Sequence, residues 1–263
     1  MPIHPTAIID PRAVIDAAAD IGPYVVIDGS VRIGARTRVL AHAVLTGWTE
    51  IGTDNVIHSH ATVGDPPQDL AYDGAETYVR IGHRNTIREH VQIHRGTKSG
   101  SATVLGDDNF LMSTAHIGHN CHVGDRVILA NGALLAGHVE VEDGAFISGN
   151  CVVHQFVRVG RLALMRGLSR TSRDVPPFCI MDGTHTVRAI NRVGLRRAGF
   201  SAAQIRSVQT AFVHLFGHSR NLRLALAELE TTADTPEVRY LIDFIRASKR
   251  GVCFGPRDVI SDE

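Results

Sequence analysis

Residues 117–141 read IGHNCHVGDRVILANGALLAGHVEV, and every sixth residue of this stretch is a large aliphatic side chain. The same register extends back to Ile3 and forward to Met165. It is interrupted at three positions, Asp69, Ala75 and Ser99. Neither a heptad nor an ordinary alternating strand keeps a strict period of six over this length, whereas a hexapeptide β-helix does. The sequence therefore predicts a mainly β fold, a parallel β-helix of hexapeptide repeats.

Two further positions of the repeat support this fold. Glycine often follows the aliphatic residue, as at Gly118 and Gly124, where it allows a sharp corner. Small residues often precede it by two positions and point to the same side of the strand. Examples are Ala43, Ala61, Ala115, Ala133, Ala145 and Ala163. Cys121 and Cys151 occupy this inward position, so we expect packed thiols and no disulfide or metal role.

Composition limits the classes of function. The formal net charge is zero, which argues against a general nucleic-acid binder. No apolar run has the length of a membrane span, and the first residues lack the layout of a signal peptide. We therefore expect a cytoplasmic protein with no membrane span.

A different pattern begins after Met165. Residues 166–200 show no hexad register, and we expect them to be irregular. From Ser201 the apolar residues follow a helical period, beginning with a Ser-x-x-Gln capping box. Further helices are expected over 221–231 and from Thr235 to near Gly251. The sequence thus predicts a β-helical domain over 1–190 and a C-terminal α-helical domain over 191–263.

Five histidines lie close together along the repeat. They are His116, His119, His122, His138 and His154. None occupies an inward position, so they should line the outer wall or the corners. His119 and His138 differ by about one coil and should be stacked. Because imidazole titrates near neutral pH, such a cluster suits a general base. Interruptions at 64–78 and after Ile93 predict two loops beside it, and loops on a rigid scaffold often carry function.

Several ordered motifs resemble a known family. They are Gln68-Asp69-Leu70, Ile87-Arg88-Glu89, Ile93-His94-Arg95-Gly96-Thr97, His116-Ile117-Gly118-His119, Leu129-Ala130-Asn131, Leu135-Ala136-Gly137-His138, Val153-His154-Gln155-Phe156 and Asp174-Val175-Pro176-Pro177. In kind and separation they resemble the UDP-N-acetylglucosamine acyltransferases, which catalyse the first step of lipid A biosynthesis. The similarity extends through the Arg196-Arg197-Ala198-Gly199-Phe200 segment and the helical tail.

This resemblance implies a homotrimer of left-handed parallel β-helices with active sites between subunits. It also implies transfer of a (3-hydroxy)acyl chain from acyl carrier protein to the 3-position of UDP-N-acetylglucosamine. The phosphopantetheine of the carrier would bear the acyl group, with no metal or other cofactor. Two points stay open: the length of the acyl chain, and whether the acceptor is a 3-hydroxyl (O-acylation) or a 3-amino sugar (N-acylation).

The resemblance also assigns roles to residues of this chain. His119 would be the general base, and the Gly137 N–H would stabilise the oxyanion. The remaining residues would bind substrate. The sugar would be held by Gln68 and Asp69, and the substrate would be positioned by His116, His138, His154 and Gln155. Gly167 would lie at the far end of the acyl chain. Asn191 and Arg197 would contact the nucleotide or its phosphates.

Three residues depart from the family pattern. Asn120 follows the catalytic histidine where an aspartate is common, and an amide stabilises an imidazolium less than a carboxylate does. Ala71 replaces a lysine in the Gln-Asp-Leu loop. Arg166 replaces a glycine beside Gly167, and its guanidinium should either shorten the acyl pocket or point away from it. Because of the first two changes, an alternative interpretation stays open: the protein is a trimeric scaffold that does not catalyse acyl transfer.

Two other interpretations concern charge and metal. Arginines are dense between Arg158 and Arg197, which suits docking of an acidic carrier protein and binding of a diphosphate. The spacing of His116, His119 and His122 also leaves open a zinc site of the kind found in trimeric β-helix carbonic anhydrases.

Overall fold

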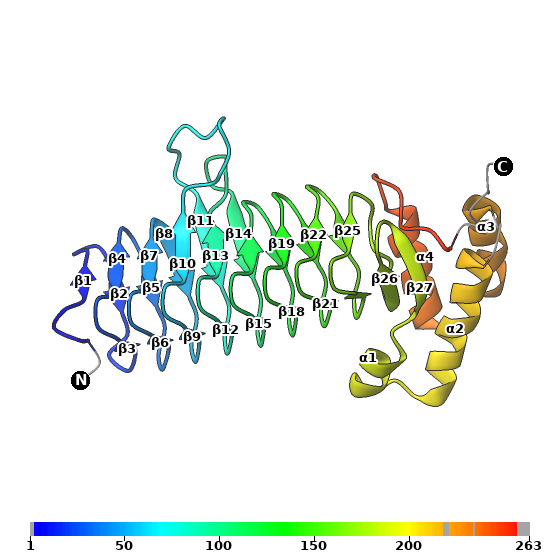
Figure 1. Cartoon of the computed structure of the whole chain (residues 1–263), viewed down its shortest axis with the longest axis horizontal. Coiled ribbons are helices and arrows are strands. Elements are labelled where there is room, and N and C mark those ends of the chain that lie inside the picture. Colours follow the sequence, from blue (N-terminus) through cyan, green and yellow to red (C-terminus); the bar gives the residue numbers. More distant parts are fainter. Residues whose placement is uncertain (1–2, 218–220, 234, 257–263) are drawn as a thin grey trace.

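The structure, a computed structural model, describes residues 3–217, 221–233 and 235–256. Stacked coils form a long column with helices at its C-terminal end (Figure 1). The coils contribute short strands to three sheets; these strands pair in parallel except for the last two of the chain, which form an antiparallel pair. The nine-stranded sheet contains β1 (Ile8–Ile9), β4 (Val26–Asp28), β7 (Val44–Thr46), β10 (Thr62–Asp65), β13 (Gln92–His94), β16 (His116–Ile117), β19 (Leu134–Leu135), β22 (Val152–Val153) and β25 (Arg170–Thr171). The eight-stranded sheet contains β2 (Val14–Ile15), β5 (Arg32–Ile33), β8 (Trp48–Ile51), β11 (Tyr78–Ile81), β14 (Ala102–Leu105), β17 (His122–Val123), β20 (Glu140–Val141) and β23 (Arg158–Val159). The ten-stranded sheet contains β3 (Asp20–Ile21), β6 (Arg38–Val39), β9 (Val56–Ile57), β12 (Thr86–Ile87), β15 (Phe110–Leu111), β18 (Ile128–Leu129), β21 (Phe146–Ile147), β24 (Leu164–Met165), β26 (Cys179–Asp182) and β27 (Thr186–Ile190).

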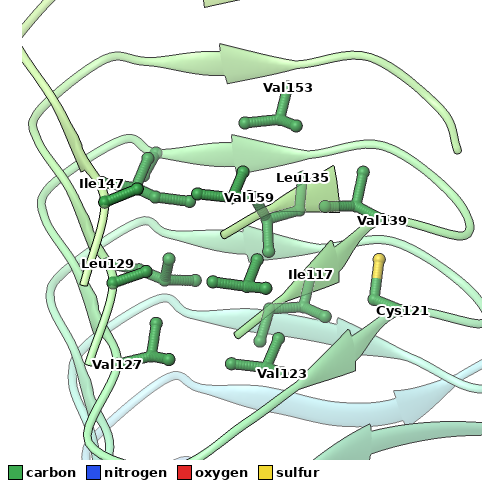
Figure 2. Packing of buried hydrophobic residues seen from close by; sticks show 14 of the residues in the cluster. Ile117, Cys121, Val123, Val127, Leu129, Leu135, Val139, Ile147, Val153 and Val159 are labelled. Carbon is green, nitrogen blue, oxygen red and sulfur yellow. The ribbon is translucent and has the colours of Figure 1, made fainter. Parts of the chain in front are cut away.

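The six-residue register is the inward face of these strands. Ile117 pairs with Leu135, and Leu135 with Val153, one coil of eighteen residues apart. Their side chains point into the column and are fully buried (Figure 2). Cys121 and Cys151 are also buried and free, as expected. Burying each such aliphatic side chain stabilises the fold by about 1.5–3 kcal/mol. The predicted parallel β-helix is confirmed.

Both expected loops are present. Residues 66–77 connect β10 to β11, and residues 95–101 connect β13 to β14, so the three interruptions of the repeat lie in loops. The longer loop stands away from the column (Figure 1). Arg95 anchors this loop to the column. Its guanidinium donates to the Gly64 carbonyl at 2.7 Å and to the Tyr72 hydroxyl at 3.2 Å, and it lies over the Trp48 ring.

The expectation of irregular structure over 166–200 was wrong. This segment contains β25, β26, β27 and the helix α1 (Arg192–Arg197). Met165 pairs with Met181, sixteen residues later, so the last coil is two residues shorter than the regular eighteen-residue coil. This shift explains why the six-residue register is lost in the sequence although the coil continues.

Three further helices pack at the C-terminal end. They are α2 (Ala202–Phe216), α3 (Leu222–Thr232) and α4 (Pro236–Arg246). The predicted capping box of Ser201 and Gln204 is confirmed. Thr235 precedes α4 as expected, but its side chain makes no capping bond. The helix ends at Arg246 and not near Gly251. The division into domains at 190 and 191 stays a prediction.

Candidate functional site

A hollow of about 440 Å³ lies on the outer face of the nine-stranded sheet, beside its corner with the eight-stranded sheet. It is lined by residues of three coils and of the longer loop. They include Gln68, His94, His116, His119, Leu134, Gly137, Val152 and Gln155. Five of the predicted site residues therefore share one hollow.

The corner after β16 fixes the protonation of His119. Its Nδ1 lies 3.1 Å from Oδ1 of Asn120, and the same oxygen accepts from the Thr97 N–H (3.1 Å) and hydroxyl (2.9 Å). Because a backbone N–H can only donate, the Asn120 atom that faces it must be the oxygen. The Nδ1 of neutral His119 therefore carries the proton, and Nε2 has the free lone pair that a general base needs.

Gly137 packs directly against this imidazole from the next coil. A Cβ on Gly137 would lie 3.0 Å from Nδ1 of His119 and closer still to Cε1 and Nε2. A larger residue there would displace the imidazole. In the described part of the chain the Gly137 N–H donates to no acceptor. An unpaired backbone donor on the residue that packs against this imidazole can stabilise an oxyanion that forms nearby.

Two further imidazoles surround His119. His138 makes an edge contact with it at 5.2 Å between ring centroids and stacks on Phe156 at 4.7 Å. Burial, and then the nearby His119, lowers the pKa of His138. Burial and the charges of His94 and His119 lower the pKa of His116 to about 4. Both flanking imidazoles are therefore neutral at neutral pH and can accept or donate hydrogen bonds.

His94 and Thr97 belong to one of the family motifs, but the sequence predicts no role for either residue. His94 is 6% exposed, and its Nδ1 donates to the Pro66 carbonyl at 2.8 Å. Its Nε2 is buried and has no partner among the described residues, although the ring lines the hollow. An acceptor in this position is available to an N–H or O–H of a substrate. The break in the repeat after Ile93 was the signal for these residues, but only the folded corner reveals their contacts.

The longer loop closes one side of the hollow. Gln68 is exposed and lines it. Asp69 caps its own turn, accepting from the Ala71 N–H at 3.0 Å, and its charge acts on His138. Of the two predicted sugar-binding residues, Gln68 therefore shares the hollow with the predicted base, and Asp69 lies near His138.

The opposite side of the hollow is apolar. Leu134 and Val152 are neighbours on the outer face of the nine-stranded sheet and are 41% and 46% exposed. Gly167 lies further along at the corner before β25, exposed, with its Cβ position 3.6 Å from the Gly149 carbonyl. The guanidinium of Arg166 is held by Asp182 of β26 at 3.1 Å. It therefore points toward the ten-stranded sheet, away from the apolar wall.

Two predicted residues are not beside the histidines. Asn191 is 5% exposed, caps α1 through the Gly194 N–H and donates to the Leu162 carbonyl. Arg197 lies at the exposed end of the same helix. Both belong to the end of the column that carries the helices. His154 is exposed, and its Nδ1 lies 3.4 Å from the guanidinium of Arg250.

The described residues contain neither a metal-binding cluster nor a membrane-spanning helix. None of their histidine, cysteine and acidic side chains form a group of three or more that could hold a metal ion. His116 and His122 point outward from different sheets, on either side of a corner. One chain therefore does not supply the three converging imidazoles of the zinc alternative. No described helix is long and apolar enough to cross a membrane.

Comparisons with known proteins agree with this fold. Residues 102–137 match the bacterial transferase hexapeptide family, and residues 174–253 match the second domain of UDP-N-acetylglucosamine O-acyltransferases. The crystal structure of the Francisella novicida UDP-N-acetylglucosamine acyltransferase has a TM-score of 0.92 at 34% identity, covering 98% of this chain and 95% of that one. The fold is thus the left-handed parallel β-helix of the hexapeptide acyltransferases.

Whole-chain relatives define the family more closely. The acyl-[acyl-carrier-protein]–UDP-N-acetylglucosamine O-acyltransferase of Thermodesulfovibrio yellowstonii is 46% identical over 254 residues, covering 95% of this chain and 98% of the relative. That of Gloeothece citriformis is 45% identical over 248 residues, covering 94% and 90%. The chain belongs to the family of acyl-[acyl-carrier-protein]–UDP-N-acetylglucosamine O-acyltransferases.

Proposed function

We propose that this protein transfers an acyl chain from acyl carrier protein to the 3-hydroxyl of UDP-N-acetylglucosamine, the first step of lipid A biosynthesis. The observation that carries this proposal is the geometry of His119. Its Nδ1 proton is fixed by Asn120, and its ring packs against Gly137, whose N–H has no acceptor among the described residues.

The chemistry follows from these two groups. Nε2 of His119 takes the proton of the sugar 3-hydroxyl as the oxygen attacks the thioester carbonyl. The Gly137 N–H stabilises the oxyanion of the tetrahedral intermediate. When the carbon–sulfur bond breaks, the imidazolium returns its proton to the leaving pantetheine thiolate. No metal or other cofactor takes part in this sequence.

The hollow accommodates both substrates. Gln68 and Asp69 would hold the sugar, and His116, His138, His154 and Gln155 would orient the reacting groups. The apolar wall of Leu134 and Val152 supports an acyl chain running from His119 toward Gly167, because burying methylene groups is favourable. Arg166 stays clear of this path while Asp182 holds it.

The ten-stranded sheet supports assembly into a homotrimer. Its outward positions carry a stripe of partly exposed apolar residues in successive coils, and such a stripe is typical of a protein interface. They are Phe110, Ile128, Phe146, Leu164 and Ile180. In a trimer, Asn191 and Arg197 would contact the nucleotide bound at a neighbouring subunit. Light scattering should give three times the chain mass of 28.5 kDa.

The carrier protein would dock on the basic end of the column. Arg192, Arg196 and Arg206 line a shallow groove between α1 and α2 that contains no acidic residue. Carrier proteins present an acidic surface, to which guanidinium groups bind well. Reversing the charge of Arg196 and Arg197 should raise the KM for the donor; unchanged KM values for both substrates would contradict this docking site. We place the reaction in the cytoplasm.

The proposed reaction is tested with purified protein, UDP-N-acetylglucosamine and a panel of acyl and 3-hydroxyacyl carrier proteins. Mass spectrometry should detect one acylated nucleotide sugar in wild type and none in the His119→Ala variant. Acylation only of a 3-amino acceptor would show an N-acyltransferase. If a folded trimer gives no product with any donor, the protein is a non-catalytic scaffold whose activity was lost through Asn120 and Ala71.

A further inference from the structure

Three histidines on successive coils stack ring on ring at one corner of the column. His42 lies between β6 and β7, His60 between β9 and β10, and His90 between β12 and β13 (Figure 1). The ring centroids of His42 and His60 are 5.1 Å apart and their planes are inclined by 3°; for His60 and His90 the values are 5.1 Å and 4°. Tyr24, one coil earlier, stacks on His42 at the same spacing. We call the three imidazoles the histidine ladder.

The spacing of the ladder in the sequence is irregular although its spacing in the structure is constant. His60 follows His42 by eighteen residues, but His90 follows His60 by thirty. The additional residues form the loop 66–77, after which the chain returns to the same register. The three histidines have almost the same backbone conformation, with φ of 63°, 62° and 60°. Their side chains therefore leave the corner in parallel.

The ring nitrogens of the ladder are not used within the chain. All three side chains are exposed, and none forms a hydrogen bond or an ion pair with another described residue. Other histidines of the same coils differ in this respect. Nδ1 of His58 lies 3.3 Å from the Glu89 carboxylate, and Nδ1 of His83 accepts from the Thr53 N–H at 2.9 Å. The ladder thus presents ligand atoms at a regular spacing.

The ladder lies at the corner between the two sheets with apolar outer faces. The ten-stranded sheet carries the apolar stripe described above. The nine-stranded sheet also has apolar outward residues, which are Val26, Val44, Leu134 and Val152. The eight-stranded sheet instead presents charged pairs such as Glu50 and Arg80, which are 3.5 Å apart on neighbouring strands. Apolar outer faces suit contacts between subunits, whereas a charged face suits solvent.

A three-fold assembly directs this corner toward its axis. Each coil has three sides, one for each sheet. In a closed ring of three subunits, one side of each subunit packs against a different side of the next. The corner shared by these two sides then lies nearest the axis. With the nine-stranded and ten-stranded sheets in contact, that corner is the one with the ladder, and each level of the ladder gathers three identical imidazoles.

We propose that the histidine ladder forms a structural zinc site on the axis of the homotrimer, with His60 of each subunit as a ligand. This inference rests on the homotrimer of the proposed function but not on acyl transfer. Zinc binds three imidazole nitrogens at about 2.0–2.1 Å and keeps a fourth position for water. A purely imidazole set also favours zinc, copper or nickel over magnesium and calcium. One chain supplies a single imidazole to each level, so the separate chain has no such site.

The level of His60 suits the ion best. The water in the fourth position lies along the axis and faces the next level. From His60 both neighbouring levels are rings of imidazoles, His42 on one side and His90 on the other, which can accept hydrogen bonds from this water. A second ion on either neighbouring level would be strongly repelled, because two divalent ions repel four times as strongly as two unit charges at the same distance. We therefore expect one ion per trimer.

The direct test is metal analysis of the full-length protein after equilibration with zinc chloride and dialysis into metal-free buffer. Mass spectrometry of the metal should give about one-third of a zinc ion per chain, because three chains share one site. A full equivalent per chain would place the site within one subunit and contradict an axial position. A trimer without bound zinc would overturn the proposal.

One substitution removes all three ligands, because the site is symmetric. His60→Gln should weaken zinc binding at least about 100-fold in calorimetry. His83→Gln is the matched control, since it removes an exposed imidazole from a different corner and should leave the Kd for zinc unchanged. Light scattering should show a trimer for both variants, because both side chains are exposed. Equal effects of the two substitutions, or tight binding retained by His60→Gln, would overturn the site.

Cobalt(II) gives a measurement that needs no variant. In a tetrahedral set of three imidazoles and one water, it absorbs visible light much more strongly than the hydrated ion does, and zinc should abolish this absorption by displacing it. The spectrum of the hydrated ion alone, in the presence of wild-type trimer, would contradict the site.

These experiments separate the zinc site from the proposed function. The ladder and His119 lie at different corners of the column, so removing zinc with a chelator should leave the rate of acyl transfer unchanged. Zinc binding that depends on His60 in a trimer without acyl transfer would support the site and count against the reaction alone. A monomeric protein would contradict both the proposed homotrimer and the axial site.

Discussion

Replacing Gly137 by alanine tests the closest contact in the proposed active site. The added Cβ would lie 3.0 Å from Nδ1 of His119 and nearer to Cε1 and Nε2, whereas ordinary contacts begin at 3.4 Å. The imidazole must therefore move by about 1 Å, a displacement that can cost about 100-fold in rate. The backbone at Gly137 does not have a positive φ, so alanine is allowed there and the fold should persist.

Steady-state kinetics should show kcat reduced at least 100-fold, with a thermal unfolding midpoint close to that of wild type. The His119→Ala variant provides the matched control, because it removes the ring that the new methyl group meets. In that background Gly137→Ala should cause no further loss of the residual rate, so the two changes are strongly non-additive. A kcat within about threefold of wild type for Gly137→Ala would refute this geometry.

Three other changes test the surroundings of His119. Asn120→Ala removes the acceptor that fixes the Nδ1 proton and should lower kcat about 10- to 100-fold, with an unchanged Kd for UDP-N-acetylglucosamine; an unchanged kcat would show that the amide is not needed. The lowered pKa of His116 means that the unfolded state binds a proton between pH 6.5 and about 4 that the folded state does not. The free energy of unfolding should therefore fall by about 3 kcal/mol as pH drops through this window. His116→Gln should flatten that slope in chemical denaturation, and an equally steep slope would contradict the assignment. Asp182→Ala removes the partner of the Arg166 guanidinium, which can then enter the path of the acyl chain. In competition assays the preference should shift toward shorter acyl donors by about tenfold. The double variant Asp182→Ala, Arg166→Gly should reverse the shift.

The fold was predictable because one physical rule is repeated along the chain. Each coil must bury its own inward residues, so Ile117, Leu135 and Val153 recur at multiples of six and record the architecture in the sequence. The last coil shows the limit of this rule. Shortened by two residues, it pairs Met165 with Met181 and leaves no hexad signal, although the structure continues.

The site was predictable only in part. His138 lies nineteen residues after His119, one more than a regular coil, so the eighteen-residue stacking brings the two rings together. The bond from Thr97 to Asn120 depends on the conformation of a loop, which no periodicity describes.

The central claim is that His119 acts as the base in acyl transfer while contributing little to acceptor binding. The most direct measurement compares wild type and His119→Gln in single-turnover acyl transfer to UDP-N-acetylglucosamine, with the acceptor Kd measured by calorimetry on the same samples. We predict a rate reduced by at least about 1,000-fold and a Kd changed by less than about threefold. A variant that retains more than about a tenth of the wild-type rate would contradict the account.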